Sequence, residues 1–258
     1  MSRPSSADPP SEGRPASPSD EDGSPRTAGR AFIDLHVHTH ASPDSLSPPA
    51  RVVRTAAARG LTHLAITDHG RIDGALEARA VAPDGLTGVV GEEVRTRDGD
   101  LICVFLSEAI PNGLSAAEAI AEARRQGGLV GIPHPFDRFR GSLGRGEAIA
   151  ALADRVDWVE THNARVFVRV GNEQARTFAA RHGLPGVAVS DAHTLWEIGV
   201  AYTILDGDPG TPDGLRAALD SAVLVTGRAS LLARAATPAA RLVQRLRAGR
   251  GAAALSRR

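Results

Sequence analysis

Lysine is absent from this chain: all 30 basic residues among its 258 positions are arginine. No lysine side chain can therefore act as a nucleophile, form a Schiff base or anchor a phosphate-binding P-loop. Thirty acidic residues balance the arginines and give a formal net charge of zero. This balance argues against broad electrostatic capture of nucleic acid or of an anionic membrane, and leaves room only for a local basic groove.

Cysteine, aromatic residues and long apolar runs are also scarce. The single cysteine, Cys103, excludes an internal disulfide, and its place in the apolar run 101–105 favours a buried core thiol. Aromatic residues make up 3% of the chain, so Val, Leu, Ile and Ala must build the core. No run of 18 apolar residues and no apolar signal core are found, so we expect a cytoplasmic protein without a membrane segment.

Composition divides the chain into three segments. Residues 1–30 are rich in Ser, Pro, Gly, Asp and Arg, and we expect a disordered tail there because little apolar surface could be buried. Residues 31–228 carry the periodic patterns of one folded domain. Residues 229–258 are rich in Ala and Arg, which predicts a basic helical extension that docks on this domain or frays.

Strand-like and helix-like patterns alternate along the central segment. Expected strands cover residues 32–39, 61–67, 87–90, 101–106, 129–132, 155–161, 186–190 and 200–205. Expected helices cover residues 48–60, 72–82, 115–127, 172–182 and 212–221. Such alternation is typical of an α/β fold with a mostly parallel sheet, and about seven units favour a closed barrel over an open sheet.

Histidine and acidic residues recur where the expected strands end. Seven of the nine histidines lie at or next to such ends: His36, His38, His40, His69, His134, His162 and His193. Acidic residues accompany them at Asp68, Glu92, Glu93 and Asp191. Because the carboxyl ends of barrel strands meet at one rim, we expect these side chains to form a single cluster.

Each of these positions alone has a structural explanation. Asp68 could cap a helix, His134 could stiffen a proline-flanked loop, and Glu93 could be solvated. His36 and His38, however, are two residues apart on a strand and therefore share a face. A single metal-binding cluster accounts for the His, Asp and Glu residues at all of these strand ends, whereas the structural explanations require a separate reason at each one.

Mixed imidazole and carboxylate ligands suit Zn, Mn or Fe, and Mg at the oxygen-rich positions. The candidates outnumber the ligands of one ion, so we expect two or three divalent ions, bridged by a carboxylate such as Glu93 or Asp191. Clusters of this kind activate water and hold the oxygens of a phosphoryl group during displacement. The lack of cysteine ligands argues against a structural zinc site.

Five segments resemble the motif series of the polymerase-and-histidinol-phosphatase (PHP) superfamily, namely residues 34–39, 66–69, 91–93, 133–135 and 190–193. The resemblance covers residues 32–227 and implies a distorted (β/α)7 TIM-like barrel with a di- or trinuclear metal centre for phosphoester hydrolysis. The metal ligands it implies, most of them also catalytic, are His36, His38, Asp44, His69, Glu93, His134, Asp191 and His193.

The family also places a ligand within residues 160–163, where His162 is favoured and Asn163 and Glu160 are the alternatives. Asp34 and Asp68 are expected to orient the ligand imidazoles from outside, and we count Asp68 with the catalytic residues. Arg165, with Arg138 or Arg140, is a candidate clamp for the substrate phosphate, although a solvated surface position explains these arginines equally well.

The resemblance is to the stand-alone bacterial phosphoesterases of this superfamily. It implies a small phosphorylated metabolite, a nucleotide or an oligonucleotide end as the substrate. Histidinol phosphatase is the alternative activity, and a non-catalytic, metal-stabilised scaffold is the alternative class. A metal-dependent amidohydrolase is disfavoured because its bridging lysine has no counterpart here. The oligomeric state is not encoded in any motif.

Overall fold

The computed structural model describes residues 29–137, 142 and 147–255, so most of the expected N-terminal tail lies outside the described residues. Nine strands form one mixed sheet in the order β7-β6-β5-β4-β3-β2-β1-β8-β9. The strands are β1 (Arg30–Val37), β2 (His63–Ile66), β3 (Thr87–Arg95), β4 (Asp100–Val104), β5 (Leu129–Ile132), β6 (Trp158–Asn163), β7 (Gly186–Val189), β8 (Tyr202–Asp206) and β9 (Val223–Val225).

The sheet curls until its two halves nearly meet. Strands β1, β2 and β3 pair in parallel, as do β5, β6 and β7, whereas β4 runs antiparallel between them. Beyond β7 the chain returns to β1, where Val37 and Ala192 form a parallel bridge and the His38 N–H donates to the Ala192 carbonyl at 2.9 Å. The protein is therefore an α/β barrel, as the sequence predicts, with nine strands where the sequence pattern predicts eight, and β9 is the additional one.

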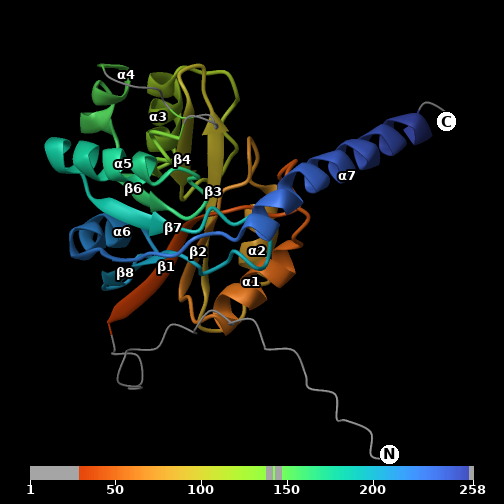
Figure 1. The fold of residues 1–258 in the computed structure, drawn as a ribbon, viewed down its shortest axis with the longest axis horizontal. Coiled ribbons are helices and arrows are strands. Elements are labelled where there is room, and N and C mark those ends of the chain that lie inside the picture. The colour runs from red at the N-terminus through yellow and green to blue at the C-terminus, as the bar shows by residue number, and fades with distance from the viewer. Residues whose placement is uncertain (1–28, 138–141, 143–146, 256–258) are drawn as a thin grey trace, which may run out of the picture.

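Helices surround this sheet (Figure 1). They are α1 (Pro49–Ala58), α2 (Asp73–Ala80), α3 (Ala116–Arg125), α4 (Glu147–Ala150), α5 (Arg169–His182), α6 (Pro212–Ala218) and α7 (Leu231–Leu255). Helix α3 begins with a capping box in which Ser115 and Glu118 satisfy each other's backbone N–H groups. This is the start that the Ser-x-x-Glu spacing predicts.

Two apolar clusters hold the barrel together. One lies between sheet and helices and includes Val53, Ile120 and Phe178, whereas the other includes the inward strand residues Ile33 and Val187. Trp158 belongs to the second cluster, and it fits there because Gly131 on β5 has no side chain. A Cβ at Gly131 would stand 2.1 Å from the Trp158 indole.

Helix α7 extends away from the barrel at the C-terminal end (Figure 1). Near its middle it still contacts the barrel, since Gln244 Nε2 donates to the His40 and Ser45 carbonyls at 2.8 and 3.0 Å. A helix therefore stands where the sequence predicts one, while the domain boundary near residue 229 stays a prediction. None of the described helices combines the length and the apolar character that a membrane crossing requires.

Candidate metal centre

The strand ends bring the expected ligands to one rim of the barrel. His36 lies on β1, and His38 follows directly after it. The remaining residues stand in the loop before α1, after β2, on β3, after β5 and after β7: Asp44, His69, Glu93, His134, Asp191 and His193. Among these side chains only that of His69 is appreciably exposed, at 18%. The cluster therefore lies inside the protein, with one open side.

Glu93 stands at the centre of the cluster. Its Oε2 lies 3.2 Å from His36 Nε2, 3.4 Å from His38 Nε2 and 3.1 Å from His69 Nδ1. Its Oε1 lies 3.2 Å from His134 Nε2. One carboxylate thus faces four imidazoles, and such a donor set suits divalent metal binding.

Asp44 and Asp191 complete the cluster on the side of His193. Asp44 lies 3.4 Å from His193 Nε2 and 3.5 Å from His69 Nε2. Asp191 Oδ1 lies 3.6 Å from His38 Nε2 and 3.7 Å from His36 Nε2. Both carboxylates therefore border the same small volume as Glu93.

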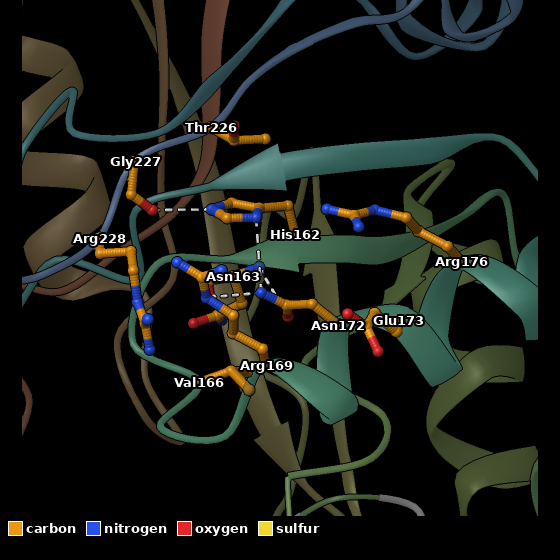
Figure 2. A pocket seen from close by; sticks show the side chains of 10 residues that line it. All are labelled: His162, Asn163, Val166, Arg169, Asn172, Glu173, Arg176, Thr226, Gly227 and Arg228. Atoms are coloured by element: carbon orange, nitrogen blue, oxygen red, sulfur yellow. Dashed lines mark hydrogen bonds between the residues drawn. The ribbon is translucent and has the colours of Figure 1, made fainter.

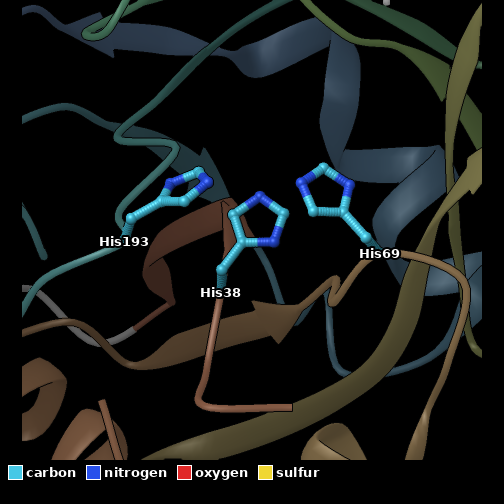
Figure 3. Close-up of side chains that lie close together, drawn as sticks. All are labelled: His38, His69 and His193. Atoms are coloured by element: carbon cyan, nitrogen blue, oxygen red, sulfur yellow. The ribbon is translucent and has the colours of Figure 1, made fainter. Parts of the chain in front are cut away.

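The ligand atoms form two adjacent groups that suit metal ions. His36, His38 and Glu93 offer atoms within 4.8 Å of one another, and His38, His69 and His193 do the same. Figure 3 shows the three imidazoles of the second group side by side. The two groups share His38, and the nitrogens of His36 and His38 stand only 3.0 Å apart. Convergent imidazole and carboxylate atoms at such spacing fit first-row divalent ions.

Local charge supports this fit. Burial opposes ionisation of Glu93, yet the nearby His69 and His36 hold the pKa of its carboxyl well below the ordinary value. Burial also opposes protonation of His69, but Glu93 and Asp44 raise the pKa of its imidazole to about 9. Protons on these imidazoles therefore neutralise the buried carboxylates, and divalent cations would supply the same positive charge.

Among the described residues, three that are not glycine have a positive φ, and two of these are candidate ligands. His134 has φ 27° and Asp191 has φ 54°, a left-handed region that residues other than glycine rarely adopt. Such conformations cost about 1–3 kcal/mol each and persist where the surrounding structure fixes a functional side chain. The strain is consistent with a role for both residues in ligand placement.

Only one of the two adjacent glutamates faces the cluster. The sequence interpretation places Glu92 and Glu93 after a strand, but β3 continues to Arg95 because it pairs with β4. Successive side chains of a strand point to opposite faces. Glu93 therefore points inward, while Glu92 accepts the Ile110 N–H at 2.8 Å on the other face.

Asp34 and Asp68 hold backbone segments and do not hydrogen-bond an imidazole. Asp68 accepts the Thr39 N–H and the Thr39 hydroxyl, each at 2.6 Å, which fixes the chain next to His38. Asp34 accepts the Ser190 N–H at 3.1 Å and the Ser190 hydroxyl, which fixes the chain before Asp191. The structure thus gives Asp68 an indirect, positioning place and not one in the ligand cluster.

Glu160 performs the orienting role that the sequence interpretation gave to the aspartates. His36 Nδ1 lies 2.6 Å from Glu160 Oε1, so the imidazole donates to this carboxylate and presents Nε2 to the cluster. Asn163 donates to Glu160 at 2.8 Å and to Asp191 at 3.0 Å. Glu160 and Asn163, both weighed as alternatives at this strand end, are therefore the residues that reach the centre.

His162 is not brought to the cluster. A register shift in β6 between Glu160 and His162 turns its side chain away from the barrel interior. Its Nε2 donates to the Gly227 carbonyl at 2.8 Å, and its Nδ1 lies 3.4 Å from Asn172 Nδ2. Both ring nitrogens are engaged in one neutral tautomer, so His162 is a poor candidate for a metal ligand.

Arginines border the open side of the cluster. A cavity of about 360 Å³ adjoins the candidate ligands and is also lined by Arg95, Arg165 and Arg241. Arg165 is held by Glu197 at 2.9 Å and by Thr237 at 2.7 Å. Arg138, the second expected substrate residue, lies outside the described residues, as does Arg140.

Arg241 is the residue that motif reasoning missed. It belongs to α7 and donates from Nη2 to Asp44 Oδ2 at 3.0 Å, although 197 positions separate the two residues. No sequence motif surrounds it. The only available signal was the predicted basic helix, whose docking position the sequence does not specify.

Comparisons with known proteins agree with this architecture. The family model of the PHP domain matches residues 34–132, and the PHP-associated model matches residues 170–223. An uncharacterised protein of Methanocaldococcus jannaschii is 38% identical over 147 residues, which are 51% of this chain and 81% of that protein. A second uncharacterised protein of the same organism is 33% identical over 178 residues, 66% of this chain and 68% of that protein.

Solved structures share the fold. One, described as a two-domain protein containing a predicted PHP-like metal-dependent phosphoesterase of Bacteroides vulgatus, has a TM-score of 0.65 at 20% identity, over 77% of this chain. This chain spans 65% of that solved chain. A lesion-specific endonuclease of Pyrococcus furiosus has a TM-score of 0.59 at 20% identity, over 74% of this chain and 56% of its own. With the motifs, the barrel and these matches in agreement, the chain belongs to the PHP family.

Proposed function

We propose that this protein is a metal-dependent phosphoesterase, with two or three divalent ions held by the candidate ligands described above. The observation that carries the proposal is the position of Glu93, whose carboxylate lies 3.1–3.4 Å from the nitrogens of four imidazoles. Mn, Zn, Fe and Mg all suit this donor set. When bound, such ions polarise phosphoryl oxygens and favour attack by water.

The chain's own side chains would position the substrate. Arg165 and Arg241 line the cavity beside the cluster, where guanidinium groups can hold phosphate oxygens with two parallel hydrogen bonds. Glu197 and Thr237 fix the Arg165 guanidinium before any substrate arrives. Asp44, Glu93 and Asp191 give the pocket a negative base that ions would neutralise.

A groove next to the cavity extends the basic surface. Arg71 and Arg245 line it together with Arg95 and Arg241, which also border the metal cavity. Four guanidinium groups along one path suit a substrate with more than one anionic group. This supports a small phosphorylated metabolite, a nucleotide or an oligonucleotide end, while a cytoplasmic location stays a prediction.

The first test is elemental analysis of the purified protein combined with assays of product release, which follow inorganic phosphate for monoesters, the aryl alcohol for the diester and shortened strands for nucleic acids. The panel contains an aryl phosphate, an aryl phosphodiester, histidinol phosphate, a nucleoside 3′,5′-bisphosphate, a 5′-phosphorylated RNA and a DNA duplex with a lesion. Each substrate is measured with and without Mn²⁺. We expect two or three metal ions per chain and metal-dependent release from at least one nucleotide substrate.

Variants separate catalysis from scaffolding. His36→Ala and Asp191→Ala should lose metal and turnover together, whereas His182→Ala, on the outer helix α5, should retain both. Full activity in both ligand variants would contradict the proposal. Bound metal without release from any substrate would favour the non-catalytic scaffold, and preferential release from histidinol phosphate would favour the histidinol phosphatase.

A further inference from the structure

A second cavity, of about 380 Å³, lies on the other side of β6 from the metal centre. Figure 2 shows its lining, which comes from the end of β6, the first two turns of α5 and the segment after β9. Its polar lining includes His162, Arg169, Asn172, Arg176, Thr226 and Arg228. Nothing in the proposed reaction uses this cavity.

Its charge is strongly positive for its size. Three guanidinium groups line it, against one carboxylate, that of Glu173. Across the described part of the chain, no acidic side chain forms an ion pair with Arg169, Arg176 or Arg228. By contrast, Arg124, Arg125 and Arg165 elsewhere on the barrel are paired at 2.6–2.9 Å. Unpaired arginines gathered around a concave site repel one another unless an anion joins them.

The wall between these arginines is rigid. His162 donates to the Gly227 carbonyl and faces the Asn172 amide, so its ring is fixed at both nitrogens. Burial lowers the pKa of His162, and the positive charges of Arg176 and Arg228 lower it further. The imidazole is therefore neutral near pH 7, and the guanidinium groups supply the positive charge of the cavity.

Asn172 links the cavity to the metal centre. Its side chain accepts the Asn163 N–H at 3.2 Å and donates to the Asn163 carbonyl at 3.3 Å. The Asn163 side chain in turn donates to Asp191 at 3.0 Å. Asn163 thus lines this cavity and contacts the candidate ligand Asp191, while different arginines line the two cavities.

We propose that this cavity binds a phosphate-bearing ligand at a site distinct from the metal centre. Arginine is the residue that best matches phosphate, because its planar fork donates two parallel hydrogen bonds to two oxygens. The Thr226 hydroxyl can donate a further hydrogen bond. A volume of about 380 Å³ accommodates a ligand between inorganic phosphate and a mononucleotide in size.

The test is calorimetric titration of the full chain, freed of metal by dialysis against a chelator, with inorganic phosphate and separately with AMP. Absence of metal makes the result independent of catalysis and of the proposed function. The variant is Arg176→Gln combined with Arg228→Gln, and we expect at least tenfold weaker binding. Arg181→Gln is the matched control, since Arg181 lies on the same helix but outside the cavity.

A further variant, Arg95→Gln, reports on the cavity beside the metal centre, which also has arginines. Loss of binding in the double variant, with wild-type binding in Arg181→Gln and Arg95→Gln, supports the proposal. Tighter binding of AMP than of phosphate then identifies a nucleotide ligand, and equal binding identifies the phosphate group alone. Unchanged affinity in a folded double variant, or no binding by the wild type at low salt, would overturn it.

Discussion

His36 is held from both ends of its imidazole, with Glu160 at Nδ1 and Glu93 near Nε2. The contact with Glu160 is the shorter one, at 2.6 Å, and both carboxylates are buried. A carboxylate behind a ligand histidine fixes the tautomer and raises the basicity of the nitrogen that faces the ion. The metal affinity of the centre is therefore expected to depend on Glu160, which lies behind His36 and does not line the cavity.

We expect Glu160→Gln to weaken metal binding about 10- to 100-fold, because an amide cannot supply the negative charge behind His36. The measurement is competition for Mn²⁺ or Zn²⁺ with a chromogenic chelator. Glu122→Gln, at a partly exposed position on α3, is the control and should bind metal like the wild type. Equal affinities in the two variants would show that Glu160 does not orient His36.

His63 makes a second residue-scale prediction, away from the metal centre. Burial lowers its pKa from the ordinary value of 6.5, and the hydrogen bond with Asp208 at 3.0 Å only partly offsets this. The folded pKa lies below the unfolded one, so the unfolded chain binds more protons between the two values. The stabilisation is full above about pH 6.5 and is lost as the pH falls through the folded pKa.

His63→Gln should therefore reduce the loss of unfolding free energy between pH 7.5 and pH 5.5. The contribution of one such group is bounded by about 1.4 kcal/mol per pH unit. Urea denaturation of the metal-free wild type and variant at both pH values measures the unfolding free energy. Because the other titrating groups are present in both proteins, the difference in pH dependence reports on His63. An identical pH dependence in wild type and variant would refute this role of His63.

At the scale of elements, α7 contributes to a site otherwise built from strand ends and their loops. Arg241 reaches Asp44, while Thr237 reaches Arg165. The Arg241 side chain is 57% exposed, so its ion pair adds little stability. Because Arg241 also lines the cavity beside the metal centre, we assign it a substrate-holding role within the proposed function.

We expect Arg241→Gln to raise KM several-fold with a smaller change in kcat. The reason is that a guanidinium group that binds substrate and transition state equally well affects substrate binding more than the chemical step. Steady-state kinetics with the best substrate of the panel checks this. Arg247→Gln, an exposed position further along α7, is the control. A fall in kcat alone would instead assign Arg241 to the transition state.

At the scale of the whole molecule, the metal centre joins segments that are far apart in sequence. Its candidate ligands range from residue 36 to residue 193 and follow or belong to β1, β2, β3, β5 and β7. Ions that bind this set bind only the folded chain. Metal binding and folding are therefore thermodynamically linked.

Adding Mn²⁺ to the metal-free protein should raise the unfolding midpoint. A free concentration of 100 Kd stabilises by about 2.7 kcal/mol per site, or roughly 5–10 °C for a domain of this size. Differential scanning calorimetry measures the shift, and Glu93→Gln should reduce it. The same shift in Glu93→Gln as in the wild type would mean that the ions bind elsewhere.

The sequence by itself determined the α/β barrel and the convergence of five of the seven strand-end histidines. Apolar strand patterns end at His69, His134 and His193, and parallel strands of a barrel deliver their ends to one rim. The local pattern is sufficient to predict the fold class, because the alternation of strands and helices follows from the periodicity of neighbouring apolar residues. The resemblance to the PHP family rests on the motifs at these same strand ends.

Only the tertiary structure decided which side chains at the ends of β3 and β6 reach the metal centre. The register shift in β6 sends Glu160 inward and His162 outward, and the pairing of β3 with β4 extends β3 through Glu93. The docking of α7 brings Arg241 to Asp44. Each outcome depends on contacts between segments distant in sequence, which fix side-chain direction in a way that no local pattern encodes.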